Sequence, residues 1–112
     1  MDIKALTHTL TIAALDTRAA LEAAQAEADT MDARARCMNA WTRTCEGNTS
    51  LTDEQVNRVY EANDRVQSRA EYAWDIVNQY HDIVEGLTGL LSDLSILESL
   101  AEHYEKIKEG RA

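Results

Sequence analysis

The 112-residue chain carries 20 aspartates and glutamates against 11 lysines and arginines, a formal net charge of −9. Direct binding of nucleic acid requires a basic patch that displaces counterions, and the sequence has none. No apolar run approaches the ~20 residues of a membrane span, and the opening residues make a poor signal peptide. We therefore expect a cytoplasmic protein with one domain over residues 1–112.

A first helix is predicted over residues 2–45, because the chain has no proline and only 4 glycines to interrupt one. From Ile3 onward, apolar residues recur at three- and four-residue steps, as on the buried face of an amphipathic helix. An extra four-residue step separates Ala24 from Ala28, in a stretch rich in alanine. Small side chains there are expected to let a second helix approach closely.

Residues 46–52 are predicted to form a turn. Gly47 is expected to end the first helix in a left-handed conformation. Thr52 and Gln55 have the spacing of a capping box at the start of the next helix. A short turn makes the two helices antiparallel neighbours.

The second helix is predicted over residues 53–90, with a heptad repeat that resembles a coiled coil. Asn63 occupies one of the core a positions. A polar residue there can fix the register of a seam at a cost in stability, or it can be half solvated, and both interpretations stay open. The a and d positions are filled by Val56, Val59, Asn63, Val66, Ala70, Ala73, Val77, Tyr80, Val84, Leu87, Leu91 and Leu94.

A third, shorter helix is predicted over residues 92–109, after the pattern loosens at Gly86 and Gly89. The fold class is therefore all-α, a long antiparallel hairpin with a shorter C-terminal helix. The apolar end of the hairpin exceeds what two helices bury, so either this third helix or a second chain is expected to cover it. The expected homodimer interface consists of Leu87, Leu90, Leu91 and Leu94.

The sequence contains no recognisable catalytic, cofactor or metal-binding pattern. The histidines lack the Glu-x-x-His spacing of di-iron helices, and no Cys-x-x-Cys or His-Glu-x-x-His motif occurs. Cys37 and Cys45 lie about 12 Å apart on one helix, farther than a disulfide allows, so both thiols are expected to be free. We expect a protein without enzymatic activity, cofactor or metal.

The most informative polar group is a row of acids on the outer face of the second helix. Between Arg69 and Lys106 the chain has no lysine or arginine. Such a row can dock on a basic protein surface, can imitate the phosphates of nucleic acid, or can be a solvated face. The candidate partner-binding residues are Glu71, Asp75, Asp82 and Glu85.

The leading hypothesis is a helical module that binds a protein partner with a basic surface and acts as an inhibitor, adaptor or chaperone. One alternative is an acidic nucleic-acid mimic, of the kind found among phage counter-defence proteins such as anti-restriction and anti-CRISPR inhibitors. A second alternative is a secretion chaperone. No direct contact with nucleic acid or membrane is expected, since the sequence has neither a basic patch nor an apolar span.

Overall fold

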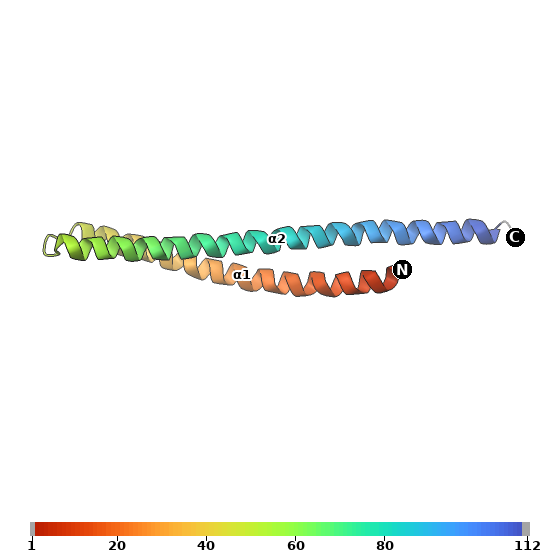
Figure 1. Cartoon of the computed structure of the whole chain (residues 1–112), viewed down its shortest axis with the longest axis horizontal. Helices are drawn as coiled ribbons and strands as arrows, with labels where there is room; N and C mark the ends of the chain where they lie inside the picture. The colour runs from red at the N-terminus through yellow and green to blue at the C-terminus, as the bar shows by residue number, and fades with distance from the viewer. Residues whose placement is uncertain (1, 111–112) are drawn as a thin grey trace. The chain divides into compact units, whose positions relative to one another are not determined.

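The protein consists of two long α-helices joined by one loop, as the computed structural model describes for residues 2–110 (Figure 1). Helix α1 spans Ile3–Glu46 and helix α2 spans Asp53–Gly110. Residues 2–110 contain no strand, which confirms the all-α class. The expected domain, residues 1–112, extends past these limits at residues 1, 111 and 112, which lie outside the described part. No helix within residues 2–110 is both long enough and apolar enough to cross a membrane.

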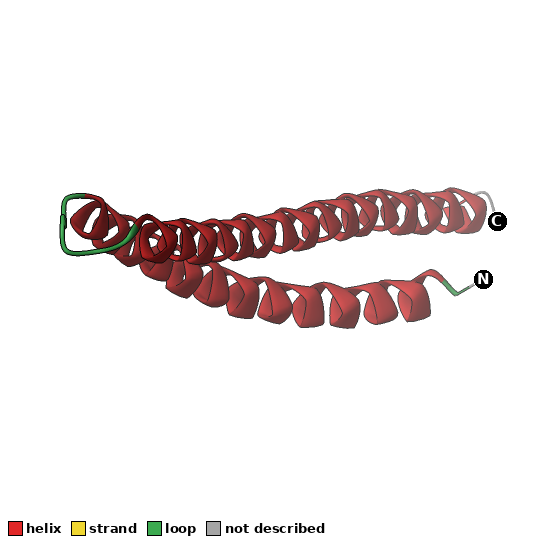
Figure 2. Ribbon diagram, turned by 60° about the vertical axis from the view of Figure 1, so that its left-hand side comes forward, coloured by secondary structure: helices red, strands yellow, loops and turns green. Residues whose placement is uncertain are grey.

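Contacts divide the helices into two units, and each is described by itself. The loop unit is Leu21–Gln79, which holds the C-terminal part of α1, the loop and the N-terminal part of α2. The terminal unit holds the described residues of Met1–Ala20 and Tyr80–Ala112. In the loop unit the two helix segments lie side by side and run in opposite directions from the loop, drawn green in Figure 2.

The start of α2 is fixed by the expected capping box. The Gln55 backbone N–H donates to the Thr52 hydroxyl at 3.2 Å, and the Thr52 N–H donates to the Gln55 side-chain oxygen at 2.9 Å. The first turn closes with the Val56 N–H bonded to the Thr52 carbonyl at 3.0 Å. Two of the N–H groups that a helix start leaves unpaired are therefore satisfied locally.

The left-handed conformation expected at Gly47 is absent, because no glycine among the described residues has a positive φ. The Gly47 N–H instead donates to the Arg43 carbonyl at 3.2 Å and so extends the helical bonding by one residue. The Asn48 side chain makes the turn, since its oxygen accepts hydrogen bonds from the Ser50 N–H at 3.0 Å and the Ser50 hydroxyl at 2.6 Å. Asparagine commonly bonds the backbone two residues on in this way. The Asn48 N–H donates to the Cys45 carbonyl at 3.1 Å, so carbonyls at the end of α1 are satisfied without a left-handed glycine.

Removing the Thr52 hydroxyl is expected to lower the free energy of unfolding by about 1 kcal/mol, the typical value for a threonine cap. The measurement is urea denaturation of Thr52→Ala followed by tryptophan fluorescence. Both tryptophans, Trp41 and Trp74, lie in the loop unit and report its unfolding. Thr49→Ala in the same loop is the matched control, and an equal loss in both variants would contradict the cap.

The core of the loop unit is built from small side chains. Ala28 is fully buried and packs with Ala73 and Val77, and Leu21 and Met31 flank this cluster. The alanine-rich part of α1 therefore faces the small residues of α2, as the sequence predicts. Along α2, every a and d position from Val56 to Leu94 is buried or half-buried, which confirms the heptad repeat.

Asn63 joins the two helices of the loop unit through a chain of amide hydrogen bonds. Its side-chain nitrogen donates to the Asn39 side-chain oxygen at 3.0 Å. The Gln67 side-chain nitrogen donates both to the Asn63 oxygen at 3.0 Å and to the Ala35 carbonyl at 2.9 Å. Asn63 is half-buried and bonded across the seam, which favours the register-fixing interpretation.

The third helix expected over residues 92–109 is not a separate element, because α2 continues without a break from Asp53 to Gly110 (Figure 1). Gly86 and Gly89 sit inside it without positive φ, and nothing lies within 4 Å of the position that a Cβ would take on either. A glycine costs a helix interior about 1 kcal/mol, which weakens the helix without ending it. No proline follows to stop the helix.

In the terminal unit, α1 packs along α2 through Ala14 and Leu94, both buried. The Arg18 side chain donates to the Thr88 hydroxyl at 3.5 Å. Ile3, at the first turn of α1, shares a shallow pocket with Glu98 and Ala101 of α2. Residues 99–110 of α2 are all exposed.

Candidate functional site

The acidic row predicted from the sequence lies on exposed positions of α2. Glu71 and Asp75 belong to the loop unit, and Asp82 and Glu85 belong to the terminal unit. Within residues 2–110, none of these carboxylates forms an ion pair with lysine or arginine. Their negative charge is therefore available to a partner.

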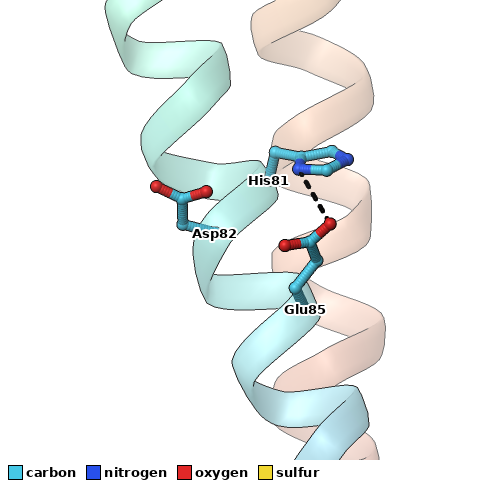
Figure 3. Close-up of side chains that lie close together, drawn as sticks. All are labelled: His81, Asp82 and Glu85. Atoms are coloured by element: carbon cyan, nitrogen blue, oxygen red, sulfur yellow. Dashed lines mark ion pairs between the residues drawn. The ribbon is translucent and has the colours of Figure 1, made fainter.

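One imidazole joins the acidic row in the terminal unit. His81 and Glu85 point toward each other from successive turns of α2, with His81 Nδ1 3.6 Å from Glu85 Oε1 (Figure 3). Potential ligand atoms of His81, Asp82 and Glu85 lie within 4.8 Å of one another. The sequence analysis missed this group because it sought a glutamate three residues before a histidine. Here the histidine precedes the glutamate by one helical turn.

Imidazole and carboxylate groups are suitable ligands for divalent metals. The side chains of His81 and Glu85 are, however, 57% and 69% exposed, and Asp82 is exposed as well. Among residues 2–110, no ligand comes from a second element and no further hydrogen bond orients the ring. We assign no metal role to this cluster, because exposed acidic side chains commonly lie this close together without binding an ion.

The expected dimer interface divides into exposed and packed positions. Leu94 is buried, and Leu87 and Leu91 are half-buried, since all three lie on the seam with α1. Leu90 alone is exposed, at 51%. Three of these leucines therefore belong to the protein's own core, and only Leu90 presents most of its side chain outward.

A second apolar row runs along α2 in the terminal unit, and the sequence analysis missed it. Its members are spaced by seven residues and are about half exposed or more. These apolar residues repeat at heptad position g in the sequence. They were overlooked because the apolar repeat at positions a and d of the same helix is stronger. The row consists of Ile83, Leu90, Leu97 and Tyr104, with exposures of 49%, 51%, 52% and 64%.

The loop unit has two adjacent hollows on one face, between α1 and α2. The first has a volume of about 410 Å³ and the second about 570 Å³. Met31 and Arg69 line both of them, so the two hollows form one groove. The groove is lined by Ala24, Glu27, Thr30, Met31, Ala33, Arg34, Cys37 and Met38 of α1 and by Val66, Ser68, Arg69, Tyr72, Ala73 and Ile76 of α2.

Near the loop, the pKa of Tyr60 is raised above its ordinary value. Partial withdrawal of the phenol from water is the largest cause, and the hydrogen bond and negative charge of Glu46 add to it. The phenol is neutral at physiological pH with or without this shift, since the ordinary pKa of tyrosine is about 10.

The two cysteines are free, as expected, with Cys37 exposed and Cys45 buried. Cys37 lies on the groove of the loop unit, whereas Cys45 lies near the loop with Trp41.

Comparison with known proteins found no match to a protein family, to a curated protein or to a solved structure.

Proposed function

We propose that this chain is a non-enzymatic helical module that binds a protein partner and acts as an inhibitor, adaptor or chaperone. The distribution of apolar side chains carries this proposal. The buried set is dominated by alanine, whereas large apolar side chains such as Leu15, Trp41 and Leu100 are more than half exposed. Exposed aromatic and apolar side chains in contiguous rows are typical of protein interfaces.

The partner is proposed to carry a basic surface, because within residues 2–110 no carboxylate of the acidic row pairs with lysine or arginine. Complementary charge speeds association and selects the partner, and it acts mainly on the association rate. The contact is therefore expected to weaken as salt rises, since the screening length is about 8 Å at physiological ionic strength. Self-association and a role as a secretion chaperone stay predictions from the sequence.

Changing Asp75 and Asp82 together to lysine is expected to abolish binding to the partner and leave helicity and thermal stability nearly unchanged. Both carboxylates are exposed, so the fold does not depend on them. The partner is captured from the native host and identified by mass spectrometry. The affinities of the wild type and of the Asp75→Lys, Asp82→Lys variant are then compared by calorimetry, beside circular dichroism.

The matched control for this experiment is Asp16→Lys with Asp29→Lys, which makes the same change in net charge at exposed positions of α1. If net charge alone governed binding, both double variants would lose affinity equally. An unchanged affinity in the α2 variant would leave the acidic row as a solvated face.

The second candidate function is mimicry of nucleic acid, in the manner of acidic counter-defence proteins. It is favoured by the absence of lysine and arginine between Arg69 and Lys106. Within residues 2–110, only Glu85 of the acidic row has an ion-pair partner, the imidazole of His81. A mimic occupies the partner's own nucleic-acid site, so a short DNA duplex is expected to compete with it. Binding that is unaffected by excess duplex favours the first proposal.

A further inference from the structure

The groove of the loop unit is a second surface, distinct from the acidic row. We propose that it docks an amphipathic helix from a protein partner, with apolar side chains on the inward face and carboxylates beside them. The proposal rests on the proposed function only in taking the ligand to be a protein. It concerns different residues, so either can fail without the other.

The floor of the groove suits apolar side chains. Met31 lines both hollows, and Ala24, Ala73 and Ile76 continue the first one. Small alanines leave space above the seam, and a flexible methionine adapts to the shape of an inserted side chain. Grooves between helices commonly receive a third helix through anchors at i, i+3 or i+4, and i+7.

The second hollow of the groove has a positive rim, although Glu27 lines the first hollow and the chain as a whole carries a net charge of −9. Arg34 on α1 and Arg69 on α2 line the same hollow. Within residues 2–110, neither guanidinium is in an ion pair, whereas Arg36 and Arg58 each pair with an acid on their own helix. An arginine binds a carboxylate through two parallel hydrogen bonds, so this rim selects an occupant with acidic flanks.

The length of the groove sets the length of the occupant. Along α1 the lining runs from Ala24 to Met38, which spans about 21 Å at 1.5 Å per residue. A docked helix of about 14 residues fills that length with about four turns. A nucleic-acid strand would supply anions for the arginines, but its backbone has no apolar anchors for Met31 and Ile76.

The test uses the full chain and a defined probe. The probe is a helical Ala-rich peptide of about 14 residues, with leucines at i, i+4, i+7 and i+11 and glutamates flanking them. The control peptide has lysine in place of each glutamate. Binding is read from fluorescence anisotropy of labelled peptide and from the rate of alkylation of Cys37, which is exposed on the groove, with buried Cys45 as an internal reference.

The glutamate peptide is expected to bind and to slow alkylation of Cys37 about tenfold at saturation, while the lysine peptide does neither. The double variant Arg34→Glu, Arg69→Glu is expected to bind the glutamate peptide at least about tenfold more weakly than the wild type does, and to bind the lysine peptide more tightly. Arg43→Glu with Arg58→Glu makes the same charge change on the same helices outside the groove and should bind as the wild type does. The Asp75→Lys, Asp82→Lys variant should also bind the glutamate peptide with the affinity of the wild type.

Several results overturn the proposal. The proposal is wrong if the glutamate peptide does not bind or if both peptides bind equally. It is also wrong if the Arg34→Glu, Arg69→Glu variant binds the glutamate peptide as tightly as the wild type does. Protection of Cys37 by an oligonucleotide in place of the peptide would assign the groove to nucleic acid. A dimer in sedimentation whose Cys37 is unreactive until dilution would assign the groove to a second copy of the chain.

Discussion

Replacing Ala28 with leucine is expected to lower the free energy of unfolding of the loop unit by about 1–3 kcal/mol, the usual cost of overpacking a tight core. Ala28 has no exposed surface and packs with Ala73 and Val77. A leucine there has no free space to enter, so α1 and α2 must move apart locally. Urea denaturation followed by tryptophan fluorescence measures the effect.

Ala26→Leu is the matched control, since Ala26 is an exposed residue of the same helix. It makes the same chemical change without contact across the seam, and alanine and leucine differ little in helix propensity. We expect its stability to stay within about 0.5 kcal/mol of the wild type. If both leucine variants unfold alike, close approach at Ala28 is not what holds the loop unit together.

Replacing Gly86 and Gly89 together with alanine is expected to raise the stability of the terminal unit by about 1.6–2 kcal/mol, because each glycine costs a helix about 0.8–1.0 kcal/mol. Both residues are helical and exposed, and neither has an atom within 4 Å of the position of an added Cβ. Alanine therefore fits at both positions without strain. Hydrogen exchange measured over residues 80–110 reports the change.

Ala26→Gly is the reverse substitution in an exposed part of α1, and it should destabilise the protein by about the same amount per residue. If the double alanine variant loses protection from hydrogen exchange around Gly86, then an uninterrupted helix is not the stable form of α2 at that point. Loss of partner binding with a gain in stability would show that another backbone approaches these glycines closely.

The sequence was sufficient to predict α1, the loop and the start of α2, because their signals are local and strong. The capping box at Thr52 and Gln55 placed the start of α2, and the heptad repeat identified the residues that pack against α1. The end of α1 was one residue off, at Glu46 instead of residue 45. The turn chemistry at Gly47 was misjudged, because the backbone N–H groups of Gly47 and Asn48 reach carbonyls of α1 without a left-handed residue.

The third helix was wrong because glycine was treated as a break. Two glycines weaken α2 by about 2 kcal/mol in total, and the residues on either side are good helix formers that carry the same repeat onward. Ser92 and Ser95, which are residues of a type that often caps helices, lie inside α2. Propensity alone could not decide this point, because a cap and an interior serine look alike in the sequence.

The candidate surfaces were predicted only in part. The exposure of Glu71, Asp75, Asp82 and Glu85 follows from their heptad positions and needed no structure. The groove beside Met31 could not be predicted, because it depends on how the side chains of two helices leave space between them. The second apolar row, with Leu97 and Tyr104, had a readable period that the stronger seam obscured.

The loop between the helices also decides how readily two chains can exchange arms. A hairpin whose loop straightens can make the same helix contacts with a second copy, which is a common route to swapped dimers. Here the Asn48–Ser50 bonds and the reciprocal Thr52–Gln55 bonds close the reversal within the loop itself. Straightening the chain through this loop into one helix breaks all of them at once. The intertwined form is therefore disfavoured by local chemistry, even though its helix contacts equal those of the single chain.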